Sequence, residues 1–230
     1  MKRCSLACLF PQNKASISVW VNPDIASALY YNGNMPNIIK VGVDEVGRGP
    51  LAGPVTVCVF AVKKGFSMRF LNGITDSKKL SQQKREYWSR KLHSARREGE
   101  VLFAITSVSA REIDKKGIVK AIQVAIRTAL RKLKLNPNKS EIFLDGSLKA
   151  PTKFLHQKTI IGGDRKNKLI STASVLAKVH RDAYMTRLAQ KYPVYGFDIH
   201  KGYGTRIHRK AIKRDGVCRE HRNNFCRNII

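Results

Sequence analysis

The feature that most constrains the fold is a succession of short apolar strands and longer amphipathic helices that begins after residue 37. Residues 39–44 alternate between apolar and small or polar side chains, which is typical of a β-strand. A nearly continuous apolar run at 55–62 predicts a second strand, and a glycine turn at 47–49 separates the two. Three further strands are predicted at 101–108, 142–146 and 158–161.

Helical periodicity occupies the segments between and after these strands. Ser81 is placed to cap the first helix, Ser109 and Glu112 have the spacing of a capping box, and Gly216 ends the last helix. The predicted helices lie at 80–97, from 109 onward, and at 118–133, 168–190 and 207–215, with a glycine- and tyrosine-rich loop at 192–205. This order of elements indicates an α/β fold with a mixed central sheet flanked by helices and a helical C-terminal part.

The chain is expected to divide at residue 37. Residues 1–37 carry little charge, contain two proline breaks and show no sustained period, so we expect an N-terminal extension, partly ordered, outside the main core. Residues 38–230 then form one domain that includes the C-terminal helical region. The hydrophobic content of 43% is sufficient for a core and excludes a wholly disordered chain.

Neither a membrane span nor a disulfide framework is indicated. No run of about 18 apolar residues is present, and the apolar run at 4–10 ends at Pro11 without a cleavage site, so we expect a cytoplasmic protein. The five cysteines are odd in number and scattered. Cys218, His221 and Cys226 could supply three zinc ligands, but their spacing matches no zinc module, and isolated thiols are the preferred interpretation.

The charge balance points to a polyanionic partner. The chain has 44 Lys and Arg residues against 16 Asp and Glu residues, for a net charge of +28. A surface of this kind favours nucleic acid, although a ribosomal-type or merely soluble basic protein would show the same balance. The basic residues are interspersed with apolar periodicity, so the folded body itself is expected to be basic.

Carboxylates are few, and several stand where predicted strands end. Asp44 and Glu45 end the first strand, Asp145 ends a later one, and Asp164 precedes the long helix. Parallel strands would bring these ends to one edge of the sheet, where open α/β folds place their sites. Each acid taken alone has an ordinary interpretation as a turn residue. Asp44 and Glu45 can converge only if the strand twists or ends between them.

Converging carboxylates repel one another unless a cation lies among them. Ligands that are all oxygen favour Mg²⁺ or Mn²⁺ over zinc or copper. A divalent cation in a strongly basic protein suggests chemistry on a phosphodiester, in which two ions activate a water and stabilise the leaving 3′ oxygen.

Three other segments have both a structural and a functional interpretation. A tight turn can expose backbone N–H groups to a phosphate or sugar, a lysine pair can contact phosphate, and a tyrosine in a basic glycine loop can stack on a base or sugar. Their structural interpretations are, in the same order, a simple tight turn, a solvated start of a helix, and an aromatic ring that covers the edge of the core. The residues concerned are Gly47, Arg48 and Gly49, then Lys78 and Lys79, and then Tyr203.

Taken together, six ordered blocks resemble the ribonuclease HII family. They cover about residues 38–225 in the right order. The blocks are VGVDEVGRGPLAGP at 41–54, DSKKLS at 76–81, FLDG at 143–146, GD at 163–164, ASVLAKVHRD at 173–182 and HKGY at 200–203.

The resemblance implies an RNase H-like fold and hydrolysis of the RNA strand of RNA–DNA hybrids. It also implies incision 5′ to single ribonucleotides embedded in duplex DNA, which leaves 3′-hydroxyl and 5′-phosphate ends. Carried over, Mn²⁺ or Mg²⁺ is held by the four catalytic carboxylates Asp44, Glu45, Asp145 and Asp164. The backbone of Gly47, Arg48 and Gly49 reads the ribose 2′-hydroxyl, Tyr203 stacks on the sugar on the DNA side of the junction, and Lys78 and Lys79 contact phosphates.

The resemblance leaves several points open. Asp182 is expected to form a structural ion pair, and the protein is expected to be a monomer. Gly162, Gly204 and the pair Asn223 and Asn224 depart from the family pattern, which puts affinity and loop rigidity in doubt. The sister family, ribonuclease HIII, usually has another middle residue in the glycine turn, so Arg48 argues against membership of that family. A nucleic-acid binder without activity and another RNase H-fold nuclease, such as a resolvase or transposase, are the rival interpretations.

Overall fold

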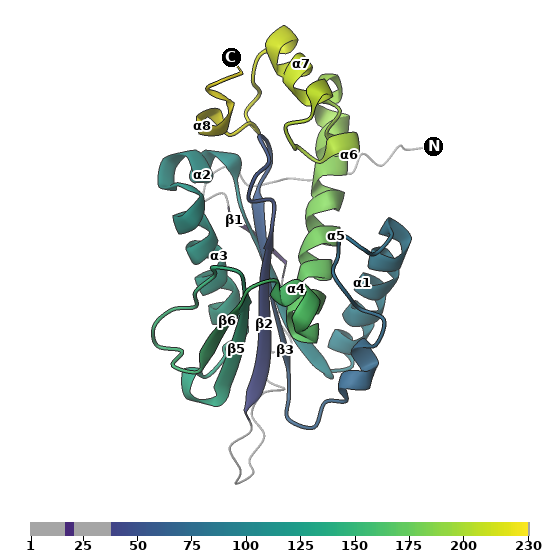
Figure 1. The fold of residues 1–230 in the computed structure, drawn as a ribbon, viewed down its shortest axis with the longest axis vertical. Coiled ribbons are helices and arrows are strands. Elements are labelled where there is room, and N and C mark those ends of the chain that lie inside the picture. The colour runs from purple at the N-terminus through teal and green to yellow at the C-terminus, as the bar shows by residue number, and fades with distance from the viewer. Residues whose placement is uncertain (1–16, 21–37, 230) are drawn as a thin grey trace, which may run out of the picture.

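The protein is described from a computed structural model that covers residues 17–20 and 38–229. A six-stranded sheet lies between two layers of helices (Figure 1), with the strand order β1-β4-β3-β2-β5-β6. The strands are β1 (Ile17–Trp20), β2 (Ile39–Val46), β3 (Val55–Val62), β4 (Val101–Val108), β5 (Ser140–Asp145) and β6 (Gln157–Ile160). The mixed α/β fold predicted from the sequence is confirmed.

The helices agree with the predicted segments where a capping signal was present. Ser81 accepts a hydrogen bond from the N–H of Lys84, and Ser109 accepts one from the N–H of Glu112. The helices are α1 (Gln82–Arg97), α2 (Ala110–Lys116), α3 (Ile118–Lys132), α4 (Gly163–Lys166), α5 (Lys168–Lys191), α6 (Phe197–His200), α7 (Arg206–Asp215) and α8 (Asn223–Cys226). In the described residues, no helix is both long and apolar enough to span a membrane.

Strand direction places the ends of β2 and β5 together. β2, β3 and β4 are antiparallel neighbours, whereas β5 and β6 run parallel to β2. A parallel pair needs a long crossover connection, and here the chain between β2 and β5 contains β3, β4 and helices α1 to α3. The carboxyl ends of β2 and β5 therefore lie at the same edge.

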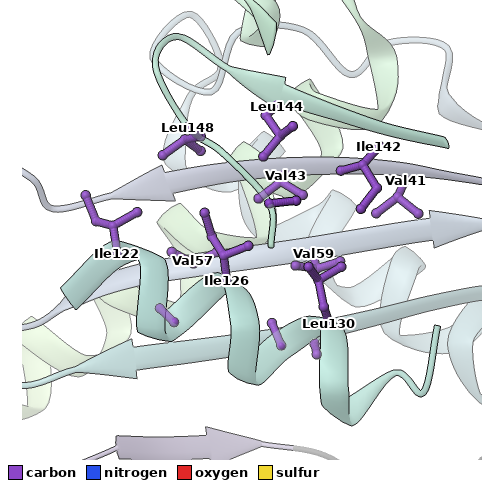
Figure 2. Packing of buried hydrophobic residues seen from close by; sticks show 14 of the residues in the cluster. Val41, Val43, Val57, Val59, Ile122, Ile126, Leu130, Ile142, Leu144 and Leu148 are labelled. Atoms are coloured by element: carbon purple, nitrogen blue, oxygen red, sulfur yellow. The ribbon is translucent and has the colours of Figure 1, made fainter. Parts of the chain in front are cut away.

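Helix α3 covers one face of the sheet with its apolar side. Ile122, Ile126 and Leu130 are spaced along one side of the helix and point toward valines of β2 and β3, as Figure 2 shows. These side chains are buried, and burial of each stabilises the fold by about 1.5–3 kcal/mol. This core fixes β2 and β5 side by side.

The opposite face is covered by α5 and α1 (Figure 1). Helix α5 approaches β2 so closely that a Cβ atom on Gly42 would lie 2.2 Å from the carbonyl carbon of Leu169. Only glycine permits this contact between two backbones. The N-terminal half of α5 is thereby held directly over the end of β2.

Two parts of the structure differ from the sequence prediction. The loop predicted at 192–205 contains two short helical turns, Pro193–Tyr195 and α6. Residues 17–20, within the predicted extension, pair with β4 as an edge strand. The rest of 1–37 lies outside the described residues, so the division at residue 37 stays a prediction.

Candidate active site

Two carboxylates lie next to each other where the parallel strands β2 and β5 end. The pairing of the strands places Val43 beside Leu144, so the next residues, Asp44 and Asp145, are neighbours. Both face the α5 side of the sheet, because Val43 and Leu144 face the α3 side. The predicted convergence of these two strand ends is confirmed.

Asp44 is buried under α5. The nearby Ser174 hydroxyl of α5 acts to lower the pKa of Asp44, and Ser174 itself is bonded to Ser77, with 2.9 Å between the two hydroxyl oxygens. Burial raises the pKa of Asp44 well above its usual value, and the charges of Glu45 and Asp145 raise it further. The carboxylate is therefore held in place while its negative charge is left poorly compensated.

Glu45 follows on the strand, and its N–H donates to Oδ1 of Asp44 at 2.7 Å. Burial raises the pKa of Glu45, the nearby Arg48 guanidinium opposes this shift, and the charge of Asp145 adds to it. Arg48 Nη1 lies 3.5 Å from Oε1 of Glu45 and also donates to Ser147 at 3.4 Å. Arg48 thus links the segments that follow β2 and β5.

Asp164 enters from α4, which is tied to β5 through Asp145. The N–H groups of Gly163 and Asp164 donate to Oδ1 of Asp145 at 2.6 and 3.4 Å. Gly162, which departs from the family pattern, precedes them with a φ of +63°. Glycine adopts this left-handed conformation without steric strain. Burial raises the pKa of Asp164, and the charges of Asp145 and Asp76 raise it further.

We call Asp44, Glu45, Asp145 and Asp164 the carboxylate site. In residues 17–20 and 38–229, no three acidic, histidine or cysteine side chains lie close enough to hold one metal ion as they stand. The charge of Asp145 nevertheless raises the pKa of Asp44, Glu45 and Asp164, and the donor atoms of all four side chains are oxygen. By the chemistry of its donor atoms, this set suits a hard divalent cation rather than a softer metal.

The two predicted lysines differ in their position. Nζ of Lys78 lies 3.9 Å from Oδ2 of Asp164, although the lysine side chain is largely exposed. Asp76 shapes this turn by accepting from the N–H of Lys78. Lys79 is exposed, and the described contacts give it no carboxylate partner. Asp182 pairs with Lys178 at 3.0 Å, which confirms the predicted structural ion pair.

The turn at 47–49, which we call the glycine turn, follows β2 directly. Gly47 is buried with a φ of +89°, and a Cβ atom there would lie 2.2 Å from Nε of Arg181. Gly49 is exposed, and a Cβ atom there would meet nothing within 4 Å. The first glycine is therefore required by the protein interior, whereas the second leaves the backbone open to a ligand.

Two arginines with no predicted role support this region from inside. Arg222 donates to the carbonyls of Gly47, Arg48 and Gly53 at 2.6, 2.9 and 3.0 Å. Arg181 donates to those of Ala52, Pro54 and Lys201 at 3.1, 2.9 and 2.9 Å. Sequence reasoning missed both, since their partners lie far away in the chain. The only signal was that Arg181 falls in the block at 173–182.

Residues 200–205, the Tyr203 loop, lie against the segment after the glycine turn. The N–H groups of Leu51 and Ala52 both donate to the carbonyl of Gly202, at 2.9 and 3.3 Å. The Tyr203 side chain is 42% exposed, and its ring lies 5.9 Å from the Arg181 guanidinium. An exposed ring beside an open turn suits stacking on a sugar or base.

Three buried histidines support the Tyr203 loop. His208 Nδ1 donates to the Tyr203 carbonyl at 2.9 Å, and its Nε2 lies 3.1 Å from Nε2 of His221. His221 Nδ1 accepts from the N–H of Cys218, so its Nε2 carries the proton that bonds to His208. His200 Nδ1 accepts from the N–H of Gly202. Both ring nitrogens of His221, a candidate zinc ligand in the sequence, are thus engaged in hydrogen bonds.

Comparison with known proteins gives a consistent result. Residues 41–228 match the sequence profile described as Ribonuclease HII. A ribonuclease HII of Shouchella clausii is 46% identical over 185 residues, which are 80% of this chain and 67% of that protein. A ribonuclease HII of Caldicellulosiruptor bescii is 40% identical over 189 residues, 82% of this chain and 87% of that protein.

A solved structure shares the fold. The crystal structure of the ribonuclease H2 from Pyrococcus horikoshii superimposes with a TM-score of 0.67 at 25% sequence identity. The match covers 84% of this chain and 97% of that protein. The aligned part thus includes almost the whole of the solved protein, and the central sheet with its flanking helices is RNase H-like.

Proposed function

Because the chain belongs to the ribonuclease HII family, we propose that its carboxylate site is the catalytic centre of a metal-dependent endoribonuclease. The activity is that of ribonuclease HII. We propose that the protein cleaves the RNA strand of RNA–DNA hybrids and cuts 5′ to single ribonucleotides embedded in duplex DNA. The products then carry 3′-hydroxyl and 5′-phosphate ends.

The observation that carries this proposal is the placement of Asp44 beside Asp145 at the ends of two parallel strands. Asp44, Glu45, Asp145 and Asp164 would hold divalent ions, Mg²⁺ or Mn²⁺, and two during catalysis. When bound, these ions activate the attacking water and stabilise the leaving 3′ oxygen. Burial and mutual repulsion disfavour the charged forms of Asp44 and Glu45. A bound cation would relieve both effects, which supports this role.

The surrounding residues position the carboxylates and the substrate. The N–H of Glu45 donates to Asp44, and the N–H groups of Gly163 and Asp164 donate to Asp145. Lys78, whose Nζ lies 3.9 Å from Oδ2 of Asp164, would contact the scissile phosphate. Lys79, exposed on the same turn, would contact a neighbouring phosphate.

Recognition of the ribonucleotide is assigned to the glycine turn and the Tyr203 loop. In our proposal the backbone of Gly47, Arg48 and Gly49 contacts the ribose 2′-hydroxyl, the group that distinguishes RNA from DNA. Tyr203 stacks on the sugar of the adjoining deoxynucleotide. The exposure of Gly49 and of the Tyr203 ring supports both assignments.

We also propose that the protein acts as a monomer in the cytoplasm. Cys58, Cys218 and Cys226 are free thiols, as expected for a reducing compartment. The net charge of +28 allows the surface to bind the duplex on its own. Sedimentation of the free protein checks the monomer.

The test is a gel assay on end-labelled duplex DNA that holds one ribonucleotide, run with Mg²⁺, Mn²⁺ or EDTA. A continuous RNA–DNA hybrid and an all-DNA duplex serve as controls. We expect a metal-dependent cut on the 5′ side of the ribonucleotide and no cut in the all-DNA duplex. Binding without cleavage under both metals would instead support an inactive nucleic-acid-binding protein.

A further inference from the structure

Arg222 is a buried cation whose side-chain hydrogen bonds, within the described residues, all go to backbone carbonyls, and its guanidinium lies 5.3 Å from the Phe225 ring. Its side chain is fully buried, and within the described residues it forms no ion pair with an acid. It donates instead to Gly47, Arg48 and Gly53. Removing a charge from water is unfavourable, so burial of this arginine lowers stability unless its hydrogen bonds compensate.

The bonds of Arg222 give the glycine turn a defined polarity. The carbonyls of Gly47 and Arg48 point inward to the guanidinium. Across the part of the chain that the structure describes, no hydrogen bond is formed by the N–H of Arg48 or by that of Gly49. Both residues are exposed. With its carbonyls held inside, the turn presents N–H donors to solvent.

Arg222 is itself anchored on both sides. Its own N–H donates to the carbonyl of Leu51 at 2.7 Å, and His221 forms a β-bridge with Ala52. On the other side, the N–H groups of Asn223 and Asn224 donate to the Asp114 carboxylate at 2.7 and 3.1 Å. The backbone at Arg222 is therefore fixed on both sides, so its guanidinium is held at a defined position beside the glycine turn.

We propose that Arg222 is a positioning residue for ribose recognition: its guanidinium holds the glycine turn with its N–H groups facing the 2′-hydroxyl of the substrate. This inference rests on the proposed function. The planar guanidinium reaches three carbonyls in fixed directions, which a lysine ammonium on a flexible stem does not reproduce. Arg222 never touches the substrate and acts through the turn.

The test compares binding of two duplexes that differ only in one 2′-hydroxyl, measured in EDTA so that no cleavage occurs. For the wild-type protein we expect tighter binding of the ribonucleotide duplex than of the all-DNA duplex. Arg222→Lys should lower this preference roughly three- to tenfold, the effect of losing one hydrogen bond to the ribose. Its affinity for the all-DNA duplex should stay within about twofold, because the basic surface is intact.

Arg219→Lys is the matched control, since Arg219 is exposed and lies three residues away in the same segment. This variant should keep the wild-type preference. An Arg222→Lys protein that keeps the full preference, or that loses affinity for both duplexes equally, would overturn the inference. A wild-type protein with no preference would overturn the assigned role of the glycine turn itself.

A second variant covers the case in which Arg222→Lys does not fold, as judged by circular dichroism. Asp114→Ala removes the acceptor of two N–H groups next to Arg222 and leaves the glycine turn untouched. A fall in the ribonucleotide preference in the same direction is expected. An unchanged preference in a folded Asp114→Ala protein would then contradict the proposed role.

Discussion

The carboxylate site and the glycine turn are neighbours along β2, and they are stabilised in opposite ways. Asp44 and Glu45 are partly or fully buried, and their charges repel each other and Asp145. The glycine turn, by contrast, has the carbonyls of Gly47 and Arg48 bound by Arg222. In the carboxylate site negative charge is left poorly compensated, whereas in the glycine turn two carbonyls are bound by a buried guanidinium.

This difference matches what each region must do. A site for cations has to retain negative charge that the protein does not neutralise, even though this lowers stability. A region that discriminates one hydroxyl has to be rigid, because a displacement of about 1 Å is enough to lose the contact. The comparison therefore predicts different consequences for substitutions in the two regions.

The largest effect is expected for Asp44→Asn. Loss of a charged ligand for the catalytic ions should reduce cleavage roughly 1,000-fold or more, while binding of the hybrid stays nearly unchanged. Cleavage rates and hybrid affinity, measured side by side, check this. Asp182→Asn is the control, because Asp182 lies in the ion pair with Lys178. Parallel loss of binding and cleavage in Asp44→Asn would contradict the metal-ligand role.

The two glycines of the turn should respond differently to alanine. Gly47→Ala should lower the free energy of unfolding by about 3 kcal/mol, because it adds a clash with Arg181 to an unfavourable φ. Gly49→Ala should change it by less than about 0.5 kcal/mol and still weaken the preference for a ribonucleotide. Urea unfolding measures the first effect and duplex binding the second. Similar stability losses in the two variants would refute this distinction.

The carboxylate site and His208, which supports the Tyr203 loop, should respond to pH with opposite signs. Burial lowers the pKa of His208 to about 4 from an ordinary 6.5, so its neutral form stabilises the fold above pH 6.5, and this contribution is lost as the pH falls toward 4. The carboxylates Asp44, Glu45 and Asp164 have raised pKa values. Their protonated forms favour the fold at low pH, and that contribution is lost as the pH rises through the raised values.

His208→Gln isolates the histidine contribution. Between pH 7.5 and 5 in metal-free buffer, the wild-type protein should lose on the order of 2 kcal/mol of stability through this group. The variant should show a smaller acid-induced loss. His156→Gln, a change at an exposed histidine, should retain the wild-type pH dependence. The assignment fails if unfolding curves of wild type and His208→Gln shift equally with pH.

The smallest effect is expected at Tyr203. Tyr203→Ala removes a stacking surface and should reduce cleavage at a single ribonucleotide roughly tenfold more than cleavage of a continuous hybrid. Tyr203→Phe keeps the ring and should behave like the wild-type protein. Initial rates on the two substrates give the ratio. An equal loss on both substrates in Tyr203→Ala would argue against stacking at the junction.

Local signals were sufficient to predict most of the fold. The strands at 55–62 and 101–108 agree with β3 and β4 at both ends, since their apolar runs are bounded by turns. Helices with a capping residue such as Ser81 were also placed within a residue or two. The edge strand β1 was missed, because its pairing with β4 depends on residues far away in the chain.

The candidate site was predictable only in part, for a similar reason. Strand ends indicated that Asp44 and Asp145 meet, and the parallel pairing of β2 with β5 bears this out. The contributions of Ser174 and Arg222 depend on contacts across the molecule, to Asp44 and to the glycine turn. No periodicity or spacing in the sequence reports a guanidinium that bonds to carbonyls 169 to 175 positions away.

The close approach of Gly42 to Leu169 limits how this protein tolerates sequence change. Most core contacts can adjust to a new residue, because side chains repack when one of them gains or loses volume. Where Gly42 faces Leu169 there is no side chain to repack, since backbone meets backbone. Random mutagenesis of the core should therefore recover many active variants at valines of β3 and almost none at position 42, although Gly42 carries no chemistry of its own.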